Sequence, residues 1–311
     1  MNLRRYLSIV FFVWILMSVI PDIQAKILVF DIGGVLLRTN TKKAMNLMGY
    51  GNLVSYTFSF HNPVNLQEKS FNALRTIKDL SIRPNHEKST YLGTPLPDIM
   101  AAWLRGDIPC QKLLAMAQTA VLDKIQSKTT RAIFSAIYHS MFDPKTNCSI
   151  QEFVPTALQL VRDLRKETDA AGNRIHKFYI LSNYNDEAFR ELYLNNTDIF
   201  DELFDGLLIS GDVGLIKPDP AIYKLLLTEY NLDVDDCYFI DDQIENVHAA
   251  TSVGFTGIHC NNFNYLQIRQ RLIKDKLLTL STSTRRTTPR KPKSKKAQVQ
   301  HKDTALTATF T

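Results

Sequence analysis

The segment Lys26–Leu37, KILVFDIGGVLL, decides the fold of this 311-residue chain. Residues 27–30 are four consecutive apolar residues, a pattern typical of a strand that is buried on both faces of a parallel sheet. Asp31 follows at the carboxyl end of this strand, which is the edge where open α/β sheets bind ligands. Gly33 and Gly34 allow the backbone to approach whatever the carboxylate holds. We therefore expect a buried strand that presents Asp31 as a nucleophile or a metal ligand.

Two later segments repeat this pattern of an apolar run that ends in polar side chains. Residues 178–183 (FYILSN) end in a hydroxyl and an amide, and residues 238–242 (YFIDD) end in paired carboxylates. Lys217 lies between them in the sequence GLIKPDP. Helical patterns at 186–194, 219–230 and 244–253 alternate with short apolar runs. The sequence therefore predicts an α/β fold with a doubly wound parallel sheet.

A long insertion separates the first two strand motifs. Asp31 and Ser182 are 151 residues apart, which is far more than one crossover helix requires. Helical periodicity recurs between them and is interrupted by proline-containing breakers; the helical segments are 43–48, 66–77, 99–104, 109–125 and 129–141. We predict an all-helical cap at residues 39–150 and an α/β core made of residues 26–38 and 151–280.

The N-terminal 25 residues have the features of a secretory signal peptide. Arg4 and Arg5 precede an apolar, charge-free run of fifteen residues, and a small residue, Ala25, ends the segment. We expect cleavage after Ala25 and export to the periplasm or the medium. The alternative is an uncleaved membrane anchor, although a spanning helix needs about 20 apolar residues.

Residues 281–311 are predicted to form a disordered basic tail. They carry eight Lys and Arg residues against one Asp, so the formal net charge of +6 belongs mainly to this tail. The folded domain is therefore not expected to bind nucleic acid. Two interpretations of the tail stay open: a solvated segment without function, which we favour, and weak contact with an anionic membrane surface.

Four cysteines are too few for a disulfide scaffold, and their spacing does not indicate zinc. Cys237 and Cys260 border core strands and are expected to be buried as small apolar residues. Cys110 and Cys148 both lie in the insertion. The sequence leaves open whether this pair forms a disulfide in an exported protein.

The order of Asp31, Ser182, Lys217 and the pair Asp241–Asp242 resembles the haloacid dehalogenase-like hydrolase superfamily over residues 26–262. Within it, D-I-G-G-V is similar to the D-x-G-N-V motif of a group that includes α-D-glucose-1-phosphate phosphatases. The resemblance implies a Rossmann-like core and a helical C1-type cap that chooses the substrate. It also implies a Mg²⁺-dependent phosphatase that acts on a small phosphorylated metabolite such as a sugar phosphate.

The resemblance also assigns roles to individual residues. Asp31 would attack phosphorus and form an aspartyl phosphate. Mg²⁺ would bind Asp31, the main-chain carbonyl of Gly33 and Asp242, with Asp241 as the second choice between the paired carboxylates. Asn246, four residues after Asp242, would orient that carboxylate or a water on the metal.

The phosphoryl oxygens need hydrogen-bond donors and a positive charge. The predicted donors are the Ser182 hydroxyl and the main-chain N–H groups of Ile32, Gly33, Gly34 and Asn183. Lys217 would place a compact positive charge between the nucleophile and the phosphate.

Gly33 departs from the superfamily pattern. Most phosphatases of this superfamily have a second Asp at this position, and such a general acid contributes about 10²- to 10⁴-fold in rate. Three interpretations remain open: the substrate has a good leaving group, as anomeric sugar phosphates and anhydrides do; a cap residue or a metal-bound water supplies the proton; or the protein binds phosphate without turnover. A 2-haloacid dehalogenase also uses such an Asp, but it has no use for the Asp241–Asp242 pair.

Overall fold

The structure is a computed structural model that describes residues 25–58, 66–79, 81–86, 88–91 and 93–279. The chain divides into two units, Met1–Thr279 and Leu280–Thr311, and all described residues belong to the first. The predicted signal peptide, apart from Ala25, and the predicted basic tail lie outside the described residues. Among the residues that were described, no helix has both the length and the apolar character needed to cross a membrane.

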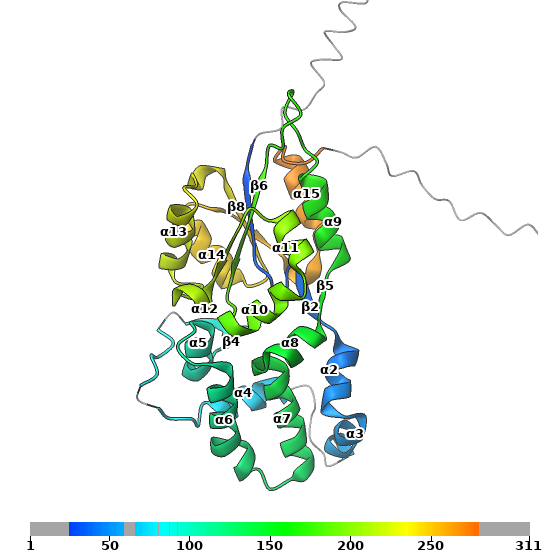
Figure 1. Cartoon of the computed structure of the whole chain (residues 1–311), viewed down its shortest axis with the longest axis vertical. Helices are drawn as coiled ribbons and strands as arrows, with labels where there is room; N and C mark the ends of the chain where they lie inside the picture. The colour runs from blue at the N-terminus through cyan, green and yellow to red at the C-terminus, as the bar shows by residue number, and fades with distance from the viewer. Residues whose placement is uncertain (1–24, 59–65, 80, 87, 92, 280–311) are drawn as a thin grey trace, which may run out of the picture. The chain divides into compact units, whose positions relative to one another are not determined.

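A parallel sheet of five strands, in the order β7-β6-β1-β8-β9, forms the centre of the core (Figure 1). The strands are β1 (Ile27–Phe30), β6 (Lys177–Ser182), β7 (Gly206–Ile209), β8 (Cys237–Asp241) and β9 (Thr256–His259). β1 lies in the middle, where Val29 is in register with Tyr179 of β6 and Phe239 of β8. The predicted parallel sheet is therefore confirmed, and β6 and β8 both flank the strand that carries Asp31.

Helices cover both faces of this sheet. They are α9 (Pro155–Leu164), α10 (Asp186–Leu194), α11 (Thr197–Leu203), α12 (Ser210–Val213), α13 (Pro220–Glu229), α14 (Ile244–Val253) and α15 (Tyr265–Lys274), with 3₁₀ turns η3 (Val234–Asp236) and η4 (Asn261–Phe263). Leu28 and Phe30 pack in one apolar cluster with residues of α9, α11 and α15. Val29, on the opposite face, packs with residues of α13 and α14. Because strand side chains alternate between faces, this division confirms the doubly wound arrangement.

The insertion between β1 and β6 is predominantly helical. Its helices are α2 (Thr41–Met48), α3 (Tyr50–Phe58), α4 (Leu66–Leu74), α5 (Asp98–Leu104), α6 (Cys110–Ala120), η2 (Leu122–Lys124), α7 (Lys128–Phe142) and α8 (Pro144–Ile150). The expectation of an all-helical cap needs one correction, because the two-residue strands β3 (Thr90–Tyr91) and β4 (Thr94–Pro95) form an antiparallel pair inside it. We keep the name cap for residues 39–150.

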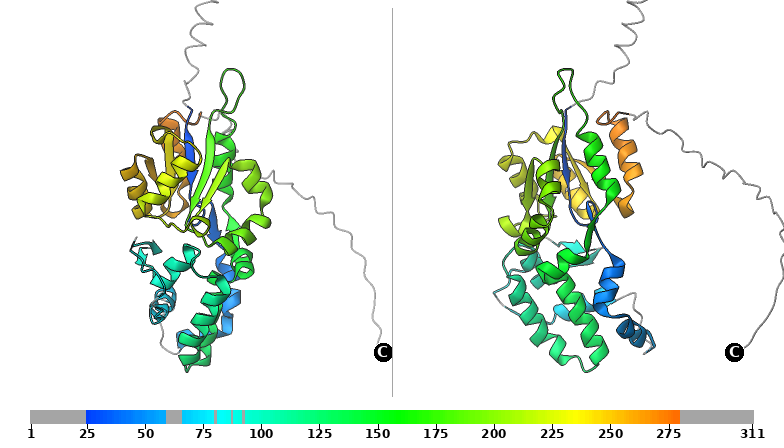
Figure 2. Two further views of the ribbon diagram at one scale, coloured as in Figure 1. Left: turned by 60° about the vertical axis from the view of Figure 1, so that its left-hand side comes forward. Right: turned by 45° about the vertical axis from the view of Figure 1, so that its right-hand side comes forward.

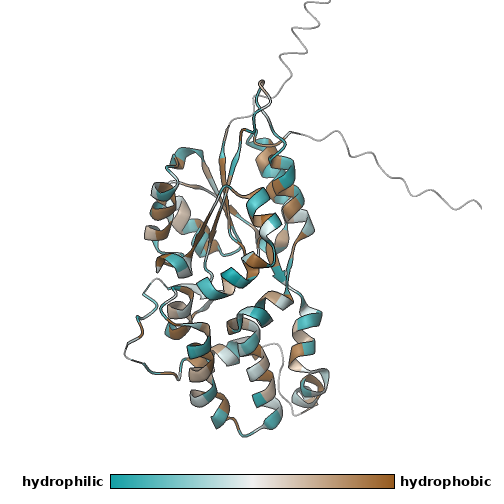
Figure 3. Cartoon of the chain, viewed as in Figure 1, coloured by the Kyte–Doolittle hydropathy of each residue, from teal (hydrophilic) through white to brown (hydrophobic). Residues whose placement is uncertain are grey.

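The cap joins the core through a short antiparallel pair, β2 (Leu37–Thr39) and β5 (Gln151–Phe153). Both views of Figure 2 show the cap beyond the carboxyl ends of the sheet strands. The cap has an apolar core of its own. In it the rings of Trp103 and Phe142 pack edge to face, with 5.0 Å between their centroids. Helices in both regions carry apolar and polar residues on the same helix (Figure 3), as expected for helices with one buried face.

All four cysteines are free. The Sγ of Cys110 lies 3.1 Å from Asn185 Oδ1, and the Sγ of Cys148 lies 3.9 Å from the carbonyl oxygen of Glu191. The pairing that the sequence left open is therefore not present. Cys237 and Cys260 are buried, as predicted.

Candidate active site

Three strand ends bring the predicted site residues together. Asp31 follows β1, Ser182 ends β6 and Asp241 ends β8, and all three are buried. The main-chain N–H of Asp31 donates to the carbonyl oxygen of Ile240 at 2.9 Å, so the β1–β8 ladder extends into the site. The position of the nucleophile candidate is thus fixed by the sheet itself.

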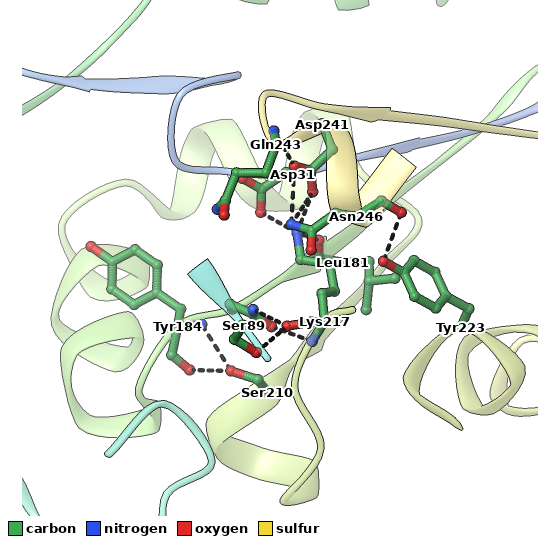
Figure 4. Close-up of polar contacts among 11 residues, drawn as sticks. Asp31, Ser89, Leu181, Tyr184, Ser210, Lys217, Tyr223, Asp241, Gln243 and Asn246 are labelled. Atoms are coloured by element: carbon green, nitrogen blue, oxygen red, sulfur yellow. Dashed lines mark hydrogen bonds and ion pairs between the residues drawn. The ribbon is translucent and has the colours of Figure 1, made fainter. Parts of the chain in front are cut away.

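The ammonium group of Lys217 lies between two carboxylates (Figure 4). It donates to Asp31 Oδ1 and Asp241 Oδ2, each at 2.7 Å, and to the carbonyl oxygen of Leu181 at 3.0 Å. The side chain is 1% exposed, and these acceptors match its three N–H donors. The structure therefore places the predicted lysine directly on the nucleophile candidate.

Asn183 and Ser89 hold the main chain of Lys217. The N–H of Lys217 donates to Asn183 Oδ1 at 2.7 Å, and Asn183 Nδ2 donates back to the Lys217 carbonyl at 2.9 Å. The hydroxyl of Ser89, a buried cap residue, donates to the same carbonyl at 2.6 Å. Sequence reasoning missed Ser89, because nothing in its local sequence indicates a contact 128 residues away.

The carboxylate of Asp241 accepts hydrogen bonds from three residues. It accepts from the main-chain N–H of Gln243 at 2.8 Å, from Asn246 Nδ2 at 3.1 Å and from Lys217. Asn246 was expected to orient Asp242 or a water, but its side-chain amide contacts Asp241 instead. These bonds make the Asp241 carboxylate less available to a cation than that of Asp242, and the choice of Asp242 as the ligand stays a prediction.

Asp242 is the carboxylate that still has an unsatisfied oxygen. Its Oδ1 is buried and has no hydrogen-bond partner within the described part of the chain. Burial, together with the charges of Asp31 and Asp241, raises the pKa of Asp242 to about 8. Burial also raises the pKa of Asp31 to about 6, although Lys217 and Ser182 act in the opposite direction.

A divalent cation fits this group of carboxylates. Oxygen atoms of Asp31, Asp241 and Asp242 lie within 4.8 Å of one another. A carboxylate set of this kind matches the hard oxygen ligands that Mg²⁺ prefers. The unsatisfied Oδ1 of Asp242 and the raised pKa of both titrating carboxylates are what a site built around a cation shows without its ion.

The two glycines after Asp31 differ in their surroundings. Gly34 has a φ of +71°, and a Cβ atom there would lie 2.1 Å from Asp242 Oδ2. A Cβ atom at Gly33 would meet no atom within 4 Å. The missing second carboxylate at position 33 is therefore not imposed by packing.

One predicted phosphate donor is already used. The main-chain N–H of Gly34 donates to the carbonyl oxygen of Leu37 at 2.9 Å, because the turn closes on itself here. The assignment of this N–H to the phosphoryl group was therefore wrong. Ile32 is fully buried, and the N–H groups of Ile32, Gly33 and Asn183 remain predicted donors.

A cavity of about 1370 Å³ opens above the carboxylates. Asp31, Ser182, Lys217 and Asp242 line its floor. Residues of the cap and further core residues, among them Gln243, Asn261 and Phe263, line the rest. This volume exceeds the roughly 300 to 1,000 Å³ of common small-molecule sites. Arg105, a buried cap residue, is not part of the lining, and its Nε donates to Asp107 Oδ2 at 3.0 Å.

A family model described as haloacid dehalogenase-like hydrolase matches residues 25–254. The chain is 40% identical over 58 residues to a sesquiterpene phosphatase of Aspergillus oryzae, a match that covers 19% of this chain and 30% of that protein. It is 35% identical over 82 residues to a drimenol cyclase of Aspergillus calidoustus, covering 26% of this chain and 15% of that protein. The chain thus spans less than a third of either relative.

The solved structures that match include one described as a predicted HAD-like family hydrolase from Porphyromonas gingivalis, with 16% identity, a TM-score of 0.49, and coverage of 81% of this chain and 98% of that one. Another is a HAD family enzyme from Bacteroides thetaiotaomicron in complex with magnesium and inorganic phosphate, with 18% identity, a TM-score of 0.44, and coverage of 75% and 93%. The family match extends over most of the described chain and includes Asp31, Lys217 and Asp242. The chain therefore belongs to the haloacid dehalogenase-like hydrolases.

Proposed function

We propose that this protein is a Mg²⁺-dependent phosphatase that uses Asp31 as its nucleophile. The observation that carries the proposal is the contact of Lys217 with Asp31 beside Asp242, whose buried Oδ1 has no partner in the described chain. A carbon-attacking dehalogenase does not need a third carboxylate at this place. The match to a protein named a phosphatase supports the same reaction class.

The proposed reaction uses residues already in position. One oxygen of Asp31 accepts a hydrogen bond from Lys217, and the other attacks phosphorus to give an acyl phosphate. Lys217, held by Asn183 and Ser89, keeps its positive charge beside the developing bond. The Ser182 hydroxyl and nearby main-chain N–H groups orient the phosphoryl oxygens. Mg²⁺ bound to Asp31, Asp242 and the Gly33 carbonyl would neutralise phosphoryl charge.

The test is phosphate release from a panel of phosphate esters and anhydrides, with and without Mg²⁺. Release is expected to require Mg²⁺ and to fall at least 10³-fold in Asp31→Asn, because the amide cannot form the acyl phosphate. Asp198→Asn, at an exposed position of α11, serves as the matched control and should retain full activity. Unchanged release in Asp31→Asn contradicts the proposal. So does tight Mg²⁺-dependent binding of beryllium fluoride without turnover of any compound in the panel.

A further inference from the structure

We propose that the substrate is a diphosphate ester of a long apolar alcohol. Its terminal phosphoryl group is transferred to Asp31, and its apolar part occupies the cavity of about 1370 Å³ above the carboxylates. This inference rests on the proposed function and adds the substrate class. Two independent features carry it: the lining of the cavity and the absence of a carboxylate at position 33.

The charged groups of the cavity lie at its floor. Of the described residues that line it, four are charged: Asp31, Lys217, Asp242 and Arg38. The guanidinium of Arg38 is paired with Glu152 at 2.7 Å. No charged side chain from the described cap contributes to the lining. Apart from Arg38, which is paired with Glu152, a ligand in this cavity therefore meets charged side chains only where Asp31, Lys217 and Asp242 lie.

Several polar side chains of the lining donate their hydrogen bonds within the protein. The Thr57 hydroxyl donates to the Leu53 carbonyl at 2.9 Å, and the Ser140 hydroxyl donates to the Ile137 carbonyl at 2.7 Å. Asn147 Oδ1 accepts from the Tyr184 hydroxyl at 2.7 Å. The hydrogens of the Thr57, Ser140 and Tyr184 hydroxyls are thus already donated within the protein. A sugar would lose water here without gaining these three groups as donors, which disfavours a sugar phosphate.

One face of helix α3 is apolar, exposed and directed to the cavity. Tyr50, Val54 and Phe58 are spaced four residues apart, are 51%, 53% and 81% exposed, and all line the cavity. Met45 and Met48 of α2 continue this lining, and methionine adapts well to irregular apolar ligands. This exposed apolar surface lines the same cavity as the proposed catalytic residues. An apolar ligand that covers the surface would explain its exposure.

The lack of a carboxylate at position 33 indicates which kind of bond the enzyme breaks. A monoester releases an alkoxide, which needs the proton that the missing carboxylate would supply. A diphosphate ester releases a phosphate monoester, which is stable as an anion without that proton. Since a side chain at position 33 would have room, the site is built without the acid rather than crowded out of it.

The reaction needs only the substrate, Asp31 and one water molecule as reactants. An oxygen of Asp31 attacks the terminal phosphorus, and the bond to the bridging oxygen breaks, so that the electron pair leaves on the apolar monophosphate. Water then adds to phosphorus, and the bond between phosphorus and the Asp31 oxygen breaks. This restores the carboxylate and leaves both protons of the water on dihydrogen phosphate.

The experiment compares farnesyl diphosphate, farnesyl monophosphate, methyl diphosphate and glucose 1-phosphate with the full chain and Mg²⁺. We expect kcat/KM for farnesyl diphosphate to exceed that for methyl diphosphate at least 100-fold, mainly through KM, since one buried methylene contributes about fourfold. The first products should be farnesyl monophosphate and one inorganic phosphate. Farnesyl monophosphate should be cleaved at least tenfold more slowly than the diphosphate.

Two variants with new charges test whether the apolar face of α3 binds the apolar part of the substrate. Val54→Asp places a charge on the apolar face of α3 at a half-exposed position, and Leu194→Asp does the same on α10, outside the cavity lining. Val54→Asp should lower the preference for farnesyl over methyl diphosphate at least tenfold, whereas Leu194→Asp should leave it unchanged. Gly33→Asp should raise kcat for farnesyl monophosphate at least tenfold more than kcat for the diphosphate.

The outcomes separate the two proposals. Equal kcat/KM for farnesyl and methyl diphosphate, with release that still depends on Asp31, overturns the apolar substrate and leaves the phosphatase intact. Faster cleavage of the monophosphate than of the diphosphate overturns the anhydride. If no compound releases phosphate, the phosphatase proposal fails. In that case, calorimetry on Asp31→Asn tests whether the cavity binds an apolar chain. If farnesyl diphosphate binds no more tightly than methyl diphosphate, the proposed apolar site is overturned.

Discussion

The main chain of Gly34 lies directly against the side chain of Asp242, so that a Cβ atom at position 34 would lie 2.1 Å from Oδ2 and 2.9 Å from Cβ of Asp242. Because Cβ is close to the main chain, Asp242 cannot avoid the clash by rotating its carboxylate alone. The positive φ of Gly34 adds about 1 to 3 kcal/mol of backbone strain for any other residue. This contact explains why the turn needs glycine at position 34.

Gly34→Ala is therefore expected to weaken Mg²⁺ binding at least tenfold and to lower kcat at least 100-fold. Gly33→Ala is the matched control, because a Cβ there meets nothing within 4 Å, and its losses should be much smaller. Calorimetric Mg²⁺ titration and steady-state kinetics measure both. Equal losses in the two variants would show that the Gly34–Asp242 contact does not matter.

Mg²⁺ should stabilise the fold through Asp242. A ligand at 100 times its Kd adds about 2.7 kcal/mol to the free energy of unfolding, so the melting temperature should rise when Mg²⁺ replaces EDTA. Asp242→Asn should lose most of this rise, and without Mg²⁺ it should be more stable than the native protein, because a buried carboxylate with a pKa of about 8 is removed. Differential scanning calorimetry in both buffers gives the two comparisons. The same Mg²⁺-dependent rise in the variant would place the cation elsewhere.

Lys217 should contribute to stability as well as to turnover. Lys217→Met leaves Asp31 and Asp241 buried without their shared cation, and breaking such a buried pair costs about 3 to 5 kcal/mol. Lys224→Met, at an exposed position of α13, is the control and should change the free energy of unfolding by less than about 0.5 kcal/mol. Urea denaturation measures both. A Lys217→Met variant as stable as the control would refute the pairing.

The fold and much of the site were predictable because both follow from strand order and side-chain type. Apolar runs predicted β1, β6 and β8, and α14 begins and ends at the predicted residues, 244 and 253. Parallel neighbouring strands present their carboxyl ends at one edge. Asp31, Ser182 and Asp241 meet because β1 pairs with both β6 and β8, an order that the structure supplies.

Other features depend on tertiary contacts that the local sequence does not carry. Helix α3 was missed because Gly51 and Asn52 are poor helix formers, and packing of Tyr56 in the cap core supports it. The Ser89–Lys217 bond joins residues far apart in the chain. The local sequence does not tell which carboxylate Asn246 contacts, since Asp241 and Asp242 precede it by five and four residues.

His176 should make stability depend on pH. It is buried, its Nδ1 accepts from the Lys26 N–H at 3.2 Å, and its Nε2 contacts the Leu277 carbonyl at 2.7 Å. Burial lowers the pKa of His176 below its ordinary value of 6.5. The unfolded chain therefore binds the proton more readily, and the free energy of unfolding should decrease as pH falls below about 6.5, by at most about 1.4 kcal/mol per pH unit.

Urea denaturation between pH 7.5 and 5 tests this dependence. His176→Gln should lower the slope of stability against pH, whereas His86→Gln, at an exposed position, should retain it. Carboxylates contribute to the slope in all three proteins, so the comparison between the variants carries the result. An unchanged slope in His176→Gln would mean that the pKa of this histidine does not differ between the folded and unfolded chain.

The covalent state of residue 31 during turnover tests most directly whether Asp31 is the nucleophile. An acyl phosphate is reduced by sodium borohydride to an alcohol, so an aspartyl phosphate at Asp31 becomes homoserine. We predict that protein quenched in acid during steady-state turnover with Mg²⁺, reduced and digested, contains homoserine at position 31, and that protein quenched without substrate does not. Turnover that leaves Asp31 unreduced, with the modification at another residue or at none, would contradict the account.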